Sequence, residues 1–151
     1  MVAEIIPCIF GICSLFLGLI VLLGYMFLSG LRKPPGMLIL WQTILQIFLD
    51  IEWGIVGFYK IGLDHNISTT SCWVLGLITI YCFFVGWNYI ICLILELIIK
   101  LKDPMNGNYK KRSPLYHIFS HLFGGAFSIY ATARKQAGES LIATCFLKEH
   151  S

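Results

Sequence analysis

Four long apolar stretches, separated by short polar gaps, dominate the pattern of hydrophobic and polar positions along the chain. They run from Ile5 to Gly30, Met37 to Tyr59, Cys72 to Ile99 and Leu115 to Ala133. A helix needs about 20 apolar residues to cross a hydrocarbon core ~30 Å thick, and each stretch reaches that length, the fourth only just. The pattern therefore predicts an all-α, multi-pass membrane protein whose transmembrane helical domain covers residues 1–133.

The basic residues collect in alternate gaps between these stretches. The first gap holds Arg32 and Lys33, and the second holds only Lys60 at its edge. The third gap holds Lys100, Lys102, Lys110, Lys111 and Arg112. Because cytosolic loops carry the excess of lysine and arginine, we expect the first and third gaps to face the cytosol and the N-terminus to lie outside. Residues 134–151 would then form an extracellular tail or outer loop of a plasma-membrane protein.

Composition supports a membrane protein and excludes several other classes. Of the 151 residues 58% are hydrophobic and 13% are charged, whereas a soluble domain has about a quarter charged residues. The net charge of +3 follows from the loops and gives no indication of nucleic-acid binding. The chain contains no nucleophile elbow, phosphate loop, zincin helix or nucleotide fingerprint, so we expect neither an enzyme nor a cofactor.

The second gap contains an N-glycosylation sequon, Asn66-Ile67-Ser68. The charge pattern places this gap outside, on the side of the membrane where glycosylation occurs. The two signals agree, and Asn66 is therefore a predicted glycosylation site.

Two carboxylates, Asp50 and Glu52, lie near the centre of the second stretch. They are two residues apart, about 200° around a helix, so they cannot share one face. A charge at this depth costs about 2.5–3.5 kcal/mol on insertion scales, and such a group normally faces protein or water. Two interpretations stay open: protonated carboxyls that pack helices together, or groups that line an ion or ligand cavity or pair with helices from elsewhere.

The third stretch carries a polar stripe of Tyr81, Asn88, Cys92 and Glu96. Their spacings keep them within about 80° of one another, and Asn88 lies near mid-membrane. Glu96 has Lys100 one turn further on, which predicts an i,i+4 ion pair. The stripe is equally typical of a packing face and of a binding site.

The fourth stretch carries His117 and His121 at i and i+4, a spacing that could hold a metal ion. No further ligand with complementary spacing is near them in the sequence, so we expect no metal. Ser120, Gly124 and Ser128 form a ridge of small residues, which permits close contact with another helix.

Two cysteines, Cys72 and Cys145, fall on the predicted outer side, where the environment is oxidising. They could form a disulfide that holds the tail over the outer end of the third helix. On topology alone, two free thiols are equally compatible.

Three groups of residues, one for each connection or helix that they mark, together resemble a known family. They are Leu31-Arg-Lys-Pro34 with Asp50 and Trp53, then Cys72 with Trp87-Asn88-Tyr89, then Lys102-Asp103-Pro104 with Lys111-Arg112 and Tyr116-His117. In these segments the chain resembles the first four helices of a seven-helix G protein-coupled receptor of the cyclic-AMP-receptor-like type, related to the secretin-like receptors.

The resemblance implies specific roles for some residues. In such receptors a cysteine at the outer end of helix three pairs with one in the second outer loop, and Cys145-Phe146 occupies that place here. This implies a Cys72–Cys145 disulfide. Helices five to seven, which complete the ligand cavity and open to admit the G protein, have no counterpart in these 151 residues, so we expect a partial or truncated receptor.

The first functional hypothesis is therefore a receptor-like integral membrane protein with an unidentified extracellular ligand and a heterotrimeric G protein as partners. Lys110, Lys111 and Arg112 would contact the cytosolic partner or anionic lipid head groups, at ~1 kcal/mol per residue. The second is a four-helix subunit or scaffold of a homo- or hetero-oligomeric membrane complex, in which Asp50 and Glu52 pair with a neighbouring chain. A small transporter or channel is the third.

Overall fold

A computed structural model of the chain describes residues 2–33, 35–62, 69–103, 108–134, 137–139 and 145–147. Among these, only the backbone is described for 2–5, 7, 8, 55–62, 69, 137–139 and 145–147. The elements are four helices, α1 (Val2–Phe27), α2 (Gly36–Gly62), α3 (Thr69–Lys102) and α4 (Tyr109–Ala133), a 3-10 turn η1 (Ser29–Arg32), and two strands, β1 (Ala137–Glu139) and β2 (Cys145–Leu147). The predicted all-α fold with four long helices is confirmed, with a two-stranded antiparallel sheet added after α4.

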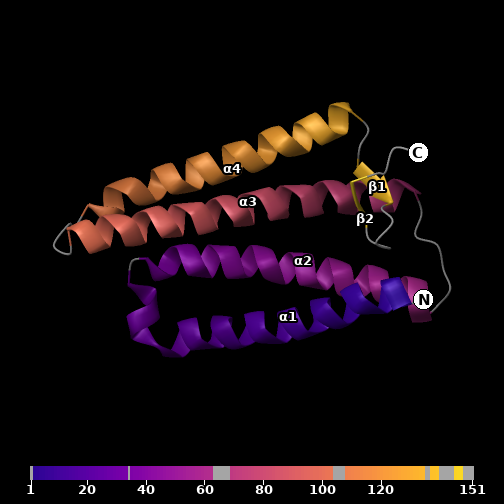
Figure 1. The fold of residues 1–151 in the computed structure, drawn as a ribbon, viewed down its shortest axis with the longest axis horizontal. Helices are drawn as coiled ribbons and strands as arrows, with labels where there is room; N and C mark the ends of the chain where they lie inside the picture. The colour runs from indigo at the N-terminus through magenta and orange to yellow at the C-terminus, as the bar shows by residue number, and fades with distance from the viewer. Residues whose placement is uncertain are drawn as a thin grey trace.

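The helices lie side by side in chain order, α1 next to α2, α2 next to α3 and α3 next to α4 (Figure 1). The short connections make consecutive helices antiparallel neighbours. Both strands contact α3, and they lie beside the end at which α3 begins (Figure 1). Helix α3 therefore touches α2, α4 and the sheet, and is the most widely connected element.

The turn between α1 and α2 ends the first helix earlier than predicted. Helix α1 ends at Phe27, not Gly30, and the guanidinium of Arg32 donates hydrogen bonds to the carbonyl oxygens of Tyr25, at 3.3 Å, and Met26. These carbonyls lie in the last turn, where no intrahelical donor is available. Gly36 begins α2 so close to the turn that a Cβ there would lie 1.8 Å from the carbonyl oxygen of Leu31.

The predicted start of the fourth helix at Leu115 is wrong, because α4 begins at Tyr109 and includes Pro114. Proline is unfavourable inside a helix, which is why the sequence favours a start after it. In the structure the residues before Pro114 are nevertheless helical, and Arg112 among them is held against α3 by an ion pair. Lys110 and Lys111 consequently lie in the first turn of α4 and not in a loop.

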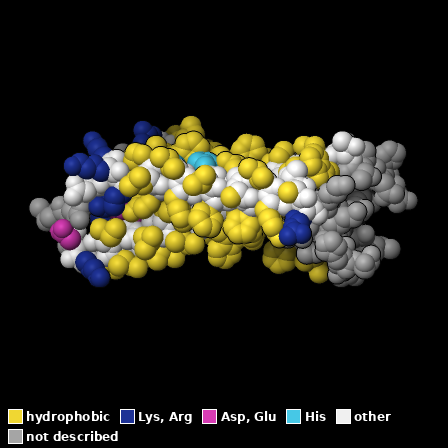
Figure 2. All heavy atoms as spheres, turned by 90° about the horizontal axis from the view of Figure 1, so that it is seen from above, with side chains coloured by type: hydrophobic (Ala, Val, Ile, Leu, Met, Phe, Trp, Pro, Cys, Tyr) yellow, Lys and Arg dark blue, Asp and Glu magenta, His cyan; other side chains and the backbone are white. Residues whose placement is uncertain are grey.

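The surface of the helices is largely apolar. Segments Ile9–Phe27 and Thr70–Lys102 are long and apolar enough to cross a membrane. Large hydrophobic side chains are exposed on all four helices, for example Phe16, Phe48, Ile94 and Leu122. Figure 2 shows apolar side chains along the length of the molecule, with most of the visible lysine and arginine side chains at one end. Such a surface indicates association with a membrane.

The buried core lies mainly between α2 and α3 and extends to the start of α4. It consists of Leu38, Leu45, Leu49, Cys82, Val85, Tyr89, Cys92 and Tyr109. The first three come from α2 and the next four from α3, so the core follows the central pair of helices.

Helices α3 and α4 approach each other closely at Gly124. A Cβ at this position would lie 2.3 Å from Cγ2 of Val85 and 3.2 Å from the carbonyl oxygen of Tyr81. Ser120, one turn earlier, is fully buried. The predicted ridge of small residues is therefore confirmed at these two positions, and it sets the distance between α3 and α4.

We expect Gly124→Ala to destabilise the α3–α4 contact by about 1–3 kcal/mol, because the added methyl group overpacks the interface. The matched control is Gly125→Ala, where a Cβ would meet nothing within 4 Å and the gain in helix propensity, up to ~1 kcal/mol, should appear alone. Denaturant unfolding of the full chain in detergent micelles measures both. Equal effects of the two substitutions would contradict the close approach.

Candidate functional site

A fully buried carboxylate, Glu96 of α3, forms the most extensive polar contact between α3 and α4. Arg112 donates from Nη2 to Oε1 at 2.8 Å and from Nε to Oε2 at 3.0 Å, and Tyr116 donates from its hydroxyl to Oε2 at 2.9 Å. Both partners come from α4, one turn apart. Two parallel charge-assisted bonds plus a phenol satisfy a carboxylate that burial would otherwise penalise.

This arrangement corrects two predictions about charged residues. The ion pair of Glu96 is with Arg112 and not with Lys100, because a guanidinium offers two parallel donors whereas an ammonium is a point charge. The Glu96 carboxylate raises the pKa of Arg112 above its usual range. Of the three basic residues predicted to contact lipid or a cytosolic partner, Lys110 and Lys111 are exposed, while Arg112 is engaged within the protein.

A second polar contact between α3 and α4 is a chain of tyrosine and histidine side chains. The Tyr81 hydroxyl lies 2.7 Å from Nδ1 of His121, and the Tyr89 hydroxyl lies 3.1 Å from Nε2 of His121 and 2.5 Å from Nδ1 of His117. Tyr89 is fully buried, and both histidines are partly buried. Three consecutive hydrogen bonds therefore connect four side chains across the interface.

Other members of the predicted polar stripe on α3 have separate roles. Asn88 is buried and its Nδ2 donates to the carbonyl oxygen of Phe84 in its own helix, at 2.9 Å. Cys92 lies 4.0 Å from the Ser120 hydroxyl. In the structure Asn88 packs within α3, and the contacts to α4 come from its neighbours on the stripe.

The two carboxylates of α2 are both buried, Asp50 with 3% and Glu52 with 8% of its surface exposed. Gln46 donates from Nε2 to Oδ1 of Asp50 at 3.0 Å. Among the described residues, Oδ2 of Asp50 has no hydrogen-bond partner. A Cβ at Gly11 would lie 3.3 Å from the Asp50 carbonyl oxygen, so this part of α2 faces α1.

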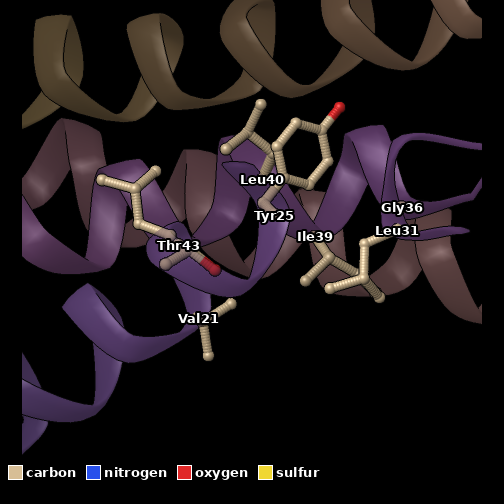
Figure 3. A pocket seen from close by; sticks show the side chains of 8 residues that line it. Val21, Tyr25, Leu31, Gly36, Ile39, Leu40 and Thr43 are labelled. Carbon is tan, nitrogen blue, oxygen red and sulfur yellow. The ribbon is translucent and has the colours of Figure 1, made fainter. Parts of the chain in front are cut away.

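Among the described residues, one pocket lies between α1 and α2 and another between α2 and α3. The pocket between α1 and α2 is lined by Val21, Leu22, Tyr25, Leu31, Gly36, Ile39, Leu40 and Thr43, and Figure 3 shows mainly hydrocarbon groups around it. The hydroxyl of Tyr25 points away from it (Figure 3) and donates to Sδ of Met37 at 3.2 Å. A pocket between α2 and α3 differs, because its lining includes the amides of Gln42 and Gln46 beside Phe83 and Trp87.

The predicted disulfide involves Cys72, near the end at which α3 begins. Cys72 is buried near the first turn of α3 and is not among the free thiols of the described residues, which are Cys13, Cys82 and Cys92. Cys145 lies in β2, opposite Glu139 of β1, and its side chain is outside the described atoms. The pairing of Cys72 with Cys145 stays a prediction, as does glycosylation of Asn66, which lies outside the described residues.

Sequence reasoning singled out His117, His121 and Glu96 but missed the partners that they contact. The histidines contact Tyr81 and Tyr89 of α3. Within the described part of the chain, no group of three or more His, Cys, Asp or Glu side chains is placed to hold a metal ion. The sequence signal that could have indicated these contacts is the helical spacing. Two tyrosines eight residues apart lie on one face of α3, and two histidines four residues apart lie on one face of α4.

Comparisons of the chain with protein-family models, with curated proteins and with solved structures found no match. The receptor family that the residues resemble therefore stays a prediction.

We expect Arg112→Ala to lower the thermal unfolding temperature in detergent clearly more than Lys111→Ala does. The first substitution leaves the buried Glu96 carboxylate without its cation, whereas the second removes an exposed charge from the same turn. Tyr116→Phe removes one hydrogen bond to a charged acceptor and should cost about 1–3 kcal/mol. Equal effects of Arg112→Ala and Lys111→Ala would contradict a structural role for the ion pair.

Proposed function

We propose that the chain is a receptor-like integral membrane protein of signal transduction that supplies the first four helices of a receptor-type bundle. The single observation that carries the proposal is the course of the chain after α4. Strands β1 and β2 turn back and contact α3, beside the end at which α3 begins (Figure 1). A segment folded over the outer end of the third helix is the arrangement that the resemblance to seven-helix receptors leads us to expect.

The proposal includes four membrane crossings with the N-terminus outside. Helices α2 and α4, with 27 and 25 residues, are about 40 Å and 38 Å long, enough to span a hydrocarbon core. Both expose large apolar side chains. The connection between α1 and α2 and the connection between α3 and α4 lie at the same end of the row of helices (Figure 1). These two connections and the elements that flank them carry Lys33, Lys102, Lys110 and Lys111, as expected for a cytosolic face.

The open row of helices also supports a role as part of a larger bundle. The extensive helix contacts link α1 to α2, α2 to α3 and α3 to α4 only, so α1 and α4 form two separate edges. A receptor would close this row with further helices. The pocket with Gln42 and Gln46 between α2 and α3 would then face the centre of the completed bundle.

A four-helix subunit of a membrane complex is the second candidate, and one observation favours it. Oδ2 of the buried Asp50 has no hydrogen-bond partner among the described residues. Because Asp50 faces α1, a polar helix of a neighbouring chain would reach this oxygen by taking the place of part of α1, and buried polar groups in a membrane normally find partners. On this hypothesis Asp50→Asn, which keeps a polar group, should preserve co-purification of the complex, and Asp50→Leu should abolish it.

The predicted Cys72–Cys145 disulfide distinguishes the two candidates. We expect non-reducing peptide mapping of membrane-extracted protein to yield a Cys72–Cys145 linked peptide, and Cys145→Ser to destabilise the chain by about 2–5 kcal/mol. The control is Cys13→Ser, which changes an exposed free thiol. Complete alkylation of both Cys72 and Cys145 in unreduced, folded protein would count against the receptor and favour the subunit.

Glycosylation mapping tests the proposed orientation. In a eukaryotic host we expect Asn66 to carry a glycan, so that Asn66→Gln increases the mobility of the chain on a gel. Lys110→Thr creates a second sequon at Asn108 in the proposed cytosolic turn and should stay unmodified. Glycosylation at Asn108 with none at Asn66 would reverse the orientation.

A further inference from the structure

The Tyr89 hydroxyl occupies a special place between α3 and α4, because it lies between two imidazole nitrogens. It is 2.5 Å from Nδ1 of His117 and 3.1 Å from Nε2 of His121. The other nitrogen of His121, Nδ1, lies 2.7 Å from the Tyr81 hydroxyl. Trp41 of α2 contacts the His117 ring edge-on, with centroids 5.7 Å apart.

The number of hydrogen atoms available to these hydrogen-bonded side chains couples the two histidines. A hydroxyl has one hydrogen, so Tyr89 donates to one imidazole and accepts from the other. If Nδ1 of His117 is the acceptor, Nε2 of His121 carries the hydrogen, and its Nδ1 accepts from Tyr81. If the order is reversed, all three bonds reverse together. When both histidines are neutral, the four side chains therefore have two arrangements of hydrogen atoms, each with three hydrogen bonds.

We propose that His117, Tyr89 and His121 form a binding site for a single proton at the α3–α4 interface. One added proton can lie on either imidazole, and the Tyr89 hydroxyl then donates to the other ring, so every bond is kept. A second proton makes both facing nitrogens donors. The hydroxyl hydrogen then has no acceptor, and two imidazolium charges stand one helical turn apart. The second protonation consequently weakens the contact between α3 and α4.

No other charged group contacts the two imidazoles in the described part of the chain, so proton binding depends on His117, Tyr89 and His121 themselves. In the described part of the chain, the hydrogen-bond and ring contacts of the two imidazoles are with Tyr81 and Tyr89 from α3 and Trp41 from α2. The next titratable group along the same face of α3 is the Cys92 thiol, beside Ser120. The carboxylate beyond it, Glu96, is already bonded to Arg112 and Tyr116.

The location of the site suggests which side supplies the proton. His117 lies six residues, about 9 Å, from Lys111 along α4. If the orientation in the proposed function holds, the source is the cytosol, and acidification there loosens α4 from α3. The proton site itself depends only on the α3–α4 packing, so its test and the test of orientation can fail independently.

The experiment is an NMR titration of the full chain in detergent micelles with isotope-labelled histidine, from about pH 8 to pH 4.5. His117→Leu and His121→Leu assign the signals. In the unmodified chain we expect the pair to take up two protons in steps separated by about one pH unit or more. Tyr89→Phe removes the bridge, which lowers the first step and raises the second, so the separation should shrink by about half a unit or more.

The matched control is Tyr81→Phe, which removes the hydroxyl at the end of the hydrogen-bonded series and leaves the Tyr89 bridge between the two histidines intact. It should leave the separation between the two protonation steps nearly unchanged. The proposal is overturned if Tyr89→Phe keeps the full separation, or if Tyr81→Phe reduces it as much. Should Tyr89→Phe fail to fold by circular dichroism, His117→Leu decides instead. His121 should then titrate once, at a lower pH than the first step of the unmodified chain, and an unchanged value would refute the shared proton.

Discussion

The close approach of α3 and α4 at Gly124 is the constraint on which the rest of the polar interior depends. Because Gly124 has no side chain to hold the helices apart at Val85, the two backbones come near enough for the polar side chains of α3 and α4 to meet. The Tyr81, Tyr89 and Glu96 side chains of α3 reach His121, His117 and Arg112 of α4 at distances of 2.5–3.1 Å. A bulkier residue at position 124 would separate all of these pairs together, since one rigid helix carries them.

The surroundings explain why these contacts are so complete. Where the outer surface of a protein faces hydrocarbon, a buried polar group has no water to bind and must find its partner inside. Glu96 satisfies this condition with three hydrogen bonds, and the two histidines with the tyrosines. Asp50 is the contrasting case, since one of its oxygens has no hydrogen-bond partner among the described residues. Glu96 and the two histidines therefore find their partners across the α3–α4 interface, whereas the Asp50 carboxyl is bonded within α2, to Gln46.

Helix α3 makes contacts along its whole length, from one end of the molecule to the other. One end of α3 contacts the strands that follow α4, and the other carries Glu96 and its ion pair with the first turn of α4. Between them lies the tyrosine–histidine chain. A change in the position of α4 relative to α3 would act on the ion pair and on the tyrosine–histidine contacts together, because both join the same two helices.

The sequence by itself determined the class of the fold, because hydrophobic length and the spacing of small residues are local properties. The four apolar stretches predicted four helices, and Ser120 and Gly124 predicted the close contact on α4; both predictions are confirmed. The start of α4 at Tyr109 and the partner of Glu96 could not be predicted in this way. Arg112 lies 16 residues from Glu96, and its competitor Lys100 lies only four away, so only the packing of α4 against α3 decides between them. The pairing of Tyr89 with two histidines has the same cause. Side chains 28 and 32 residues apart in the chain meet only because the two backbones cross without a side chain between them.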